Sequence, residues 1–211
     1  MPRVVAVTPG DGRDLAPWIA ALSDLPGLVI REPDRPASAV RALAERAIAV
    51  GIPAVAVHVK CAGAREIARD LGVGVHRSAH VGPPGGVRWH SASCHGWSAV
   101  EDALAQGARF VFLSPIWRPG SKPEDTRRPL GPGVFAGRDG RRVLALGGIT
   151  VSRAVRARAS GAAGVAVCGA LFGAPCPEEC ARTLAGLLAA VGGDEMRSGS
   201  RRRLGPASEV S

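Results

Sequence analysis

The sequence predicts an α/β fold, a single (β/α)8 TIM barrel. Three observations lead to this expectation: eight short apolar runs rich in valine, helical patterns between most of them, and a length of 211 residues, which suits one large domain. Continuous apolar runs are typical of parallel strands that are covered on both faces. A doubly wound open sheet is the alternative. The predicted strands are residues 3–8, 27–32, 53–59, 72–76, 87–92, 109–114, 142–147 and 163–169.

The segments between the strands show apolar residues three and four positions apart, which is the period of an amphipathic helix. Ser98 and Thr150 are suitable N-cap residues, because their hydroxyl oxygens can accept from the first amides of a helix. Two connections lack a helical pattern: residues 77–86, and the long segment 115–139, which is rich in proline, glycine and arginine. The predicted helices are residues 14–25, 37–50, 64–71, 98–107, 150–160 and 177–191.

Composition limits the domain organisation and the compartment. Residues 1–191 are expected to form the barrel, and residues 192–211 a disordered polar tail. No apolar run reaches the ~18–20 residues that a membrane span needs, and the N-terminus lacks the pattern of a signal peptide. The five cysteines form no CxxC pair, so reduced thiols are expected. The sequence therefore favours a cytoplasmic protein without a membrane partner.

The chain is basic, with a formal net charge of +9. Its arginines are scattered along predicted helices and turns and form no single stripe, so no nucleic-acid partner is expected. The one run, Arg201–Arg203, lies in the predicted tail. A small phosphorylated ligand would also suit this charge. The oligomeric state is left open, with a homodimer as one option.

Two successive apolar runs end in glycine, "RVLALGGIT" at residues 142–150 and "GVAVCGALFG" at residues 164–173. In a barrel they would be strands 7 and 8, and the loops after these strands frequently bind phosphate. Glycine lets the backbone approach a ligand closely, and a short helix opening at Gly169 would add its N-terminal dipole. Gly147, Gly148, Cys168 and Gly169 are therefore predicted to bind a phosphate monoester. The alternative is that these turns need glycine for steric reasons alone.

Several motifs resemble those of the thiamin phosphate synthases and the closely related thiazole tautomerases. They are "REP" after strand 2, "GVGVH" at strand 4, "SCH" after strand 5, "FLSPIWRPGSKP" at strand 6, "LALGGIT" and "GVAVCGALF". The resemblance runs, in order and spacing, from residue 3 to about residue 190. It implies an enzyme of thiamin biosynthesis that joins a thiazole phosphate to a pyrimidine methyl diphosphate while pyrophosphate leaves.

The resemblance also implies roles for single residues. Arg31 matches the arginine of the strand 2 motif, and Ser93 and His95 match the Ser-x-His after strand 5. Ser121 and Lys122 match a (Ser/Thr)-Lys pair that touches the phosphates. The expected catalytic residues are Arg31, His58, His95 and Lys122, and the expected substrate- and phosphate-binding residues are Ser93, Ser121, Gly147, Gly148, Cys168 and Gly169.

Histidines supply the candidate acid and base, because an imidazole titrates near neutral pH. His58 and His95 are placed at strand ends that face the predicted site. His76, His80 and His90 are expected to be structural.

The chain departs from the family pattern on the diphosphate side of the site. The pattern's lysine two residues after Arg31 is replaced by Pro33, and its glutamine two residues before by Val29. Its Asn-Asp-Arg after strand 3 is replaced by His-Val-Lys, which keeps only the charge of Lys60. The resemblance implies Mg²⁺ as a cofactor, but the expected carboxylate ligands are absent, and no metal-binding residue is predicted.

Two alternatives to the synthase stay open. One is a metal-free thiazole tautomerase-like isomerase, although the histidine that this branch uses near the end of strand 6 is Pro115 here. The other is a non-catalytic protein that binds a phosphorylated ligand. The basic loop 117–131 is either a lid over such a ligand or a solvated loop.

Overall fold

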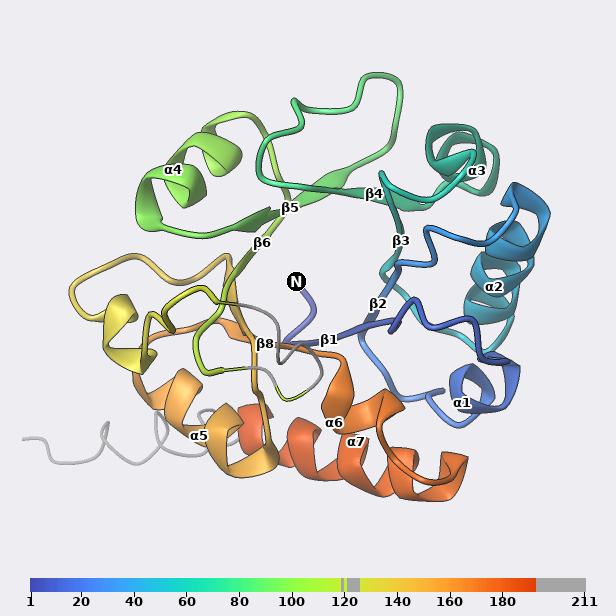
Figure 1. Cartoon of the computed structure of the whole chain (residues 1–211). Helices are drawn as coiled ribbons and strands as arrows, with labels where there is room; N and C mark the ends of the chain where they lie inside the picture. The colour runs from blue at the N-terminus through green and yellow to red at the C-terminus, as the bar shows by residue number, and fades with distance from the viewer. Residues whose placement is uncertain (119, 121–125, 193–211) are drawn as a thin grey trace, which may run out of the picture.

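Eight parallel strands close into a barrel in the computed structural model, which describes residues 1–118, 120 and 126–192 (Figure 1). Each strand pairs with the next along the chain, and β8 pairs with β1, with Val4 opposite Val165. This closure confirms the predicted (β/α)8 barrel and rules out the open sheet. The strands are β1 (Val4–Val7), β2 (Gly27–Ile30), β3 (Val55–His58), β4 (Gly74–Arg77), β5 (His90–Cys94), β6 (Val111–Leu113), β7 (Val143–Leu146) and β8 (Gly164–Val167).

The interior of the barrel is packed by side chains that alternate along the strands with side chains facing the helices. Gly74 shows how tight this packing is, because a Cβ atom there would lie 2.5 Å from the ring of Trp89. The other alternate positions belong to a larger apolar layer between the sheet and the helices. The inner cluster consists of Val5, Val29, Ala56, Phe110, Phe112, Leu144 and Ala166.

Helices surround the strands, and α5 and α7 pack side by side (Figure 1). All six predicted helices are present, although α1 is much shorter than the predicted 14–25. Thr150 caps α5, with its Oγ1 accepting from the amide of Arg153 at 3.3 Å. The prediction of Ser98 as an N-cap is wrong, because α4 begins at Trp97 and Gly96 is its N-cap. The helices are α1 (Ala16–Ala20), α2 (Ala37–Ala49), α3 (Ala64–Leu71), α4 (Trp97–Ala105), α5 (Val151–Ala159), α6 (Gly169–Phe172) and α7 (Pro177–Gly192).

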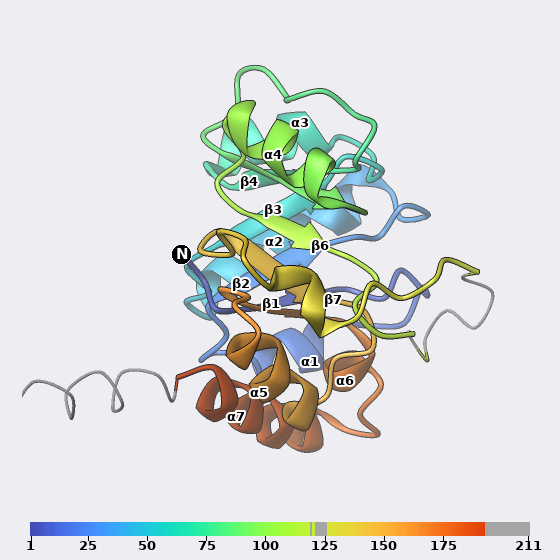
Figure 2. The same ribbon diagram turned by 90° about the vertical axis from the view of Figure 1, so that its left-hand side faces the viewer.

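The two connections expected to lack a helix differ in detail. The β4–β5 connection is a loop, and the buried side chain of Arg77 links it to the end of α4. Its guanidinium donates to the Val81 carbonyl at 2.6 Å and to Gln106 Oε1 at 2.8 Å. The connection after β6 contains, in its described part, the short 3₁₀ turn η1 (Pro132–Phe135). Figure 2 shows the connections after β1 and β6 extending from the same end of the barrel.

The chain's C-terminal region is described as far as the end of α7 at Gly192. The remainder of the predicted tail, residues 193–211, lies outside the described residues. Within the described ranges, no helix has the length and the apolar content that crossing a membrane requires.

Candidate functional site

A cavity of about 820 Å³ opens at the C-terminal ends of the strands, and residues at the ends of all eight strands line it. Barrel enzymes place their sites at this face, and the volume is typical of a small-molecule site. Ser121 and Lys122 lie outside the described residues. The other eight predicted site residues meet at this cavity, and they are Arg31, His58, Ser93, His95, Gly147, Gly148, Cys168 and Gly169.

The corner after β7 is made by Gly147 and Gly148, whose φ angles are 102° and 60°. A Cβ atom on Gly148 would lie 2.6 Å from the Arg118 carbonyl oxygen. One on Gly147 would lie 3.0 Å from Pro115 Cα and from the Trp117 carbonyl oxygen. Both glycines are thus required by the backbone conformation and by the loop after β6, whether or not a ligand binds. The fold therefore requires glycine at these two positions for steric reasons. As a result, backbone atoms form this part of the cavity wall.

The corner after β8 leads directly into α6, as the sequence predicts. Cys168 is its N-cap, and the Cys168 carbonyl accepts from the amides of Leu171 and Phe172 at 3.1 and 2.9 Å. The first amides of a helix have no acceptor within it, so those of Gly169 and Ala170, which line the cavity, can serve a ligand. Because β7 and β8 are adjacent in the barrel, the two glycine corners lie on the same side of the mouth.

Basic side chains surround the mouth, and no acidic side chain belongs to the described part of the lining. Arg153 was missed by the sequence analysis. Its Nη1 donates to the Gly148 carbonyl at 2.6 Å, and its guanidinium lies 5.5 Å from the centroid of the Trp117 ring. The signal that could have found it is its position three residues after the cap of the helix that follows the β7 corner. The lining cations are Arg31, Lys60, Arg118, Arg127 and Arg153.

His76 forms part of the floor. Its Nδ1 lies 2.8 Å from Ser91 Oγ and its Nε2 lies 2.9 Å from Ser93 Oγ. The ring stacks on Phe112 with the centroids 4.6 Å apart. Burial, reinforced by nearby positive charge, holds the pKa of His76 well below its usual value, so the ring is neutral. This satisfied histidine matches the structural role expected for it, and it also positions the Ser93 hydroxyl at the cavity.

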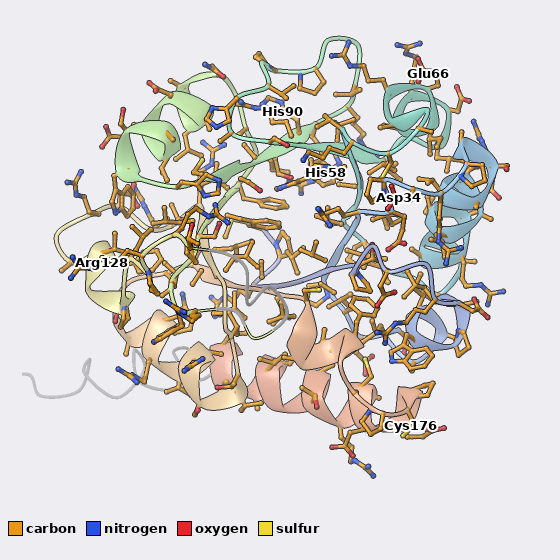
Figure 3. All side chains as sticks on the ribbon, viewed as in Figure 1. Asp34, His58, Glu66, His90, Arg128 and Cys176 are labelled. Atoms are coloured by element: carbon orange, nitrogen blue, oxygen red, sulfur yellow. The ribbon has the colours of Figure 1, made fainter. Side chains whose placement is uncertain are left out.

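The two candidate acid–base histidines differ in tautomer. Figure 3 shows His58 on the inner side of the barrel wall, while Glu66 and Cys176 lie at the periphery. The Lys60 amide donates to His58 Nδ1 at 3.1 Å, so the proton of a neutral His58 is on Nε2.

In His95, Nδ1 lies 2.9 Å from the Ser114 carbonyl oxygen, and a neutral ring that donates to this carbonyl has its lone pair on Nε2. The Nη1 atom of Arg127 lies within 2.9 Å of both His95 ring nitrogens and can donate to Nε2. His58 thus presents a donor and His95 an acceptor.

A family model described as thiamine monophosphate synthase matches residues 20–171. The chain belongs to this family. A putative thiamine-phosphate synthase from Geobacter sulfurreducens is 38% identical over 107 residues, 49% of this chain and 50% of the relative. A thiamine-phosphate synthase from Chromobacterium violaceum is 38% identical over 84 residues, 40% of this chain and 41% of the relative. The chain thus spans half or less of the length of these curated relatives.

Solved structures agree on the fold. A thiamine phosphate pyrophosphorylase from Pyrococcus furiosus has a TM-score of 0.68 at 17% identity, covering 90% of this chain and 97% of its own. One from Bacteroides thetaiotaomicron has a TM-score of 0.67 at 20% identity, covering 91% and 98%. At this identity the likeness establishes the barrel, and the chemistry has to be argued from the site.

The cavity of this family member does not fit the Mg²⁺ ion that the resemblance implies. Magnesium prefers carboxylate oxygens, and the described lining has none. Glu32 is the first carboxylate after β2, but it is 1% exposed, accepts from the Gly10 amide at 3.0 Å and pairs with Arg35 at 3.3 Å. Among the described residues, no group of three or more His, Cys, Asp or Glu side chains is arranged to hold a metal ion.

Proposed function

We propose that this protein acts in thiamin biosynthesis as a thiamin phosphate synthase-like enzyme. It would bind thiazole phosphate in the cavity and couple it to hydroxymethylpyrimidine diphosphate, with release of pyrophosphate. One observation carries the proposal: two glycine corners share a cavity with five basic side chains and no described carboxylate. Such a lining favours anionic ligands, because basic side chains gather at the mouth and no acidic side chain belongs to its described lining.

The roles follow from the position of each group. The corner amides and Arg153 would hold the thiazole phosphate, and Ser121 and Lys122 remain predicted contributors. In the reaction the bond between the pyrimidine methylene carbon and the diphosphate oxygen breaks, and its electron pair leaves with pyrophosphate. The thiazole nitrogen then donates its lone pair to that carbon and forms the new C–N bond. Arg31 and Lys60 would stabilise the negative charge that develops on the leaving group.

The direct test is product formation. The purified protein is mixed with the pyrimidine diphosphate and the thiazole phosphate, with and without Mg²⁺, and thiamin phosphate and pyrophosphate are measured. Equal amounts of the two products are expected, together with growth of a thiamin auxotroph that expresses the protein. Thiazole phosphate that stabilises the protein thermally without any turnover would contradict the proposal and would indicate a non-catalytic phospho-ligand-binding protein.

The histidine tautomers favour a second candidate, a metal-free thiazole tautomerase-like isomerase. An isomerisation that moves a proton needs one group to donate it and another to accept it, and His58 Nε2–H and His95 Nε2 offer these two states. Arg127 would have to release His95 Nε2 first. If this candidate is right, His58→Gln and His95→Gln each slow the interconversion of thiazole phosphate tautomers by about 10²-fold or more. Unchanged rates in both variants would remove it.

A further inference from the structure

The cations of the cavity lie on two opposite sides of the mouth. Arg31 and Lys60 follow β2 and β3, and we refer to them as the β2–β3 pair. In a closed barrel of eight strands, the strands opposite these two are β6 and β7, and Figure 1 shows β3 and β6 facing each other across the barrel. The other lining cations, Arg118, Arg127 and Arg153, follow β6 and β7. The mouth therefore offers two separate places for negative charge.

The β2–β3 pair is held in place through its backbone. The Arg31 amide donates to Thr8 Oγ1 at 2.7 Å. Gly10, with φ at 71°, packs directly on Arg31, and a Cβ atom there would lie 2.9 Å from the Arg31 carbonyl oxygen and 3.2 Å from its Nη1. The Lys60 amide donates to His58 Nδ1. These contacts fix the backbone positions of Arg31 and Lys60, and the charged ends of both side chains line the cavity.

Within the described part of the chain, neither Arg31 nor Lys60 makes an ion pair with a carboxylate. The described ion pairs involve other basic residues, such as Arg35 with the buried Glu32 and Arg41 with Asp70. The β2–β3 pair thus places two positive charges at a lining that lacks described carboxylates. An anion placed there would meet a guanidinium fork and an ammonium group, which bind phosphate oxygens directly.

We infer that Arg31 and Lys60 form a diphosphate-binding subsite that needs no divalent cation. The inference rests on the proposed function, in which a diphosphate leaves at this cavity, and adds that protein cations take the place of the metal. The inference predicts the direction in which Mg²⁺ changes the affinity for pyrophosphate. Mg²⁺ bound to pyrophosphate neutralises part of its charge and brings a second cation toward Arg31 and Lys60. Added Mg²⁺ should therefore weaken pyrophosphate binding, whereas a metal-dependent subsite would bind only in its presence.

The experiment is calorimetric titration of the full chain with inorganic pyrophosphate, in EDTA and in excess Mg²⁺. We expect binding in EDTA and a weaker affinity in Mg²⁺. Lys60→Gln and Arg31→Gln should each weaken binding in EDTA by about tenfold or more, the scale of one lost charge-assisted hydrogen bond. Lys60→Arg should keep most of the affinity. The control is Arg141→Gln, because Arg141 precedes β7 at the opposite end of the barrel and is 88% exposed.

Three results would overturn the inference: binding that appears only with Mg²⁺, wild-type affinity in both Gln variants, or no pyrophosphate binding in either buffer. A melting curve for each variant shows whether it is folded, and Lys60 is exposed enough for its variants to fold. The proposed function is judged separately by thiamin phosphate formation. A protein that makes thiamin phosphate and binds pyrophosphate only with Mg²⁺ would keep the function and lose this inference.

Discussion

The corner after β7 is built from backbone, whereas the opposite wall after β2 and β3 is built from side chains. At the corner, Gly147 and Gly148 pack against the backbone of the β6 connection, and the Trp117 amide donates to the Gly147 carbonyl at 3.1 Å. At the wall, the side chains of Arg31 and Lys60 reach the mouth, while their backbone amides donate to Thr8 Oγ1 and His58 Nδ1.

This difference separates two ways of binding an anion. A site made from backbone amides is part of the fold, so a change that damages it also destabilises the protein. A site made from side chains at strand ends can change its ligand chemistry while the barrel stays intact. The wall is also where the sequence departs from the family pattern, at Val29, Pro33 and residues 58–60. Substitutions at the corner should therefore lower both stability and binding, whereas substitutions at the wall should lower binding and leave stability nearly unchanged.

Gly148→Ala should break the corner and have the largest effect. At φ 60° an alanine costs ~1–2 kcal/mol, and its Cβ would clash with the Arg118 carbonyl oxygen, adding ~1–3 kcal/mol. Urea denaturation should therefore show a loss of about 2–5 kcal/mol in the free energy of unfolding, and thiazole phosphate binding should be lost.

Gly137→Ala is the matched control for the corner. Gly137 has a φ of 69°, but nothing lies within 4 Å of the added Cβ, so only the conformational cost applies. Equal losses in the two variants would show that packing against the β6 connection contributes nothing.

Beneath the side-chain wall, the His76 floor should behave as part of the fold. Its pKa is lowered in the folded state by burial, so the unfolded state binds the extra proton first as the pH falls. Stability is thus full above the unfolded pKa of about 6.5 and falls below it, by up to ~1.4 kcal/mol per pH unit. Denaturation curves from about pH 7.5 to about pH 5.5 should show this slope.

The His76→Gln variant should lose most of that slope. Some slope should remain, because burial and Arg77 also lower the pKa of His90. His80, which is exposed at the cavity, provides the control as His80→Gln. A His76→Gln variant with an unchanged slope would show that another group dominates the acid sensitivity.

The barrel itself could be predicted from the sequence, because most of its strands lie in apolar runs. The exception is β5, whose residues HSASC are polar or small, and which begins at His90 rather than at residue 87. Helix starts were less predictable. α4 begins at Trp97 rather than after Ser98 because the Trp97 side chain is tied to the β6 connection: its Nε1 donates to the Val134 carbonyl, and its ring meets Phe135 edge-on. α1 begins only at Ala16, whose amide donates to Asp14 Oδ1, and it ends at Ala20 because turns follow directly.

The parts of the candidate site that lie in sequence motifs were predictable. The parts that only folding brings together were not. The glycine corners and His95 stand in short motifs. Arg127 lies in the basic loop 117–131 that the sequence offered as a possible lid, whereas Arg153 looks like any other scattered arginine. Only folding of the barrel brings the two to one mouth. The two tautomers depend on a backbone amide and a carbonyl, which no sequence pattern displays.

The smallest loss of stability is expected on the side of the mouth that is built from side chains. Lys60→Gln should change the free energy of unfolding by no more than about 0.5 kcal/mol, as expected for an exposed side chain, while pyrophosphate binding falls about tenfold. On the corner side, Arg153→Gln should cost about 1 kcal/mol, because the half-buried guanidinium donates to the Gly148 carbonyl. Paired urea denaturation and calorimetry measure both quantities. If Lys60→Gln cost as much stability as Arg153→Gln, the wall would be part of the fold and the two sides of the mouth would not differ in kind.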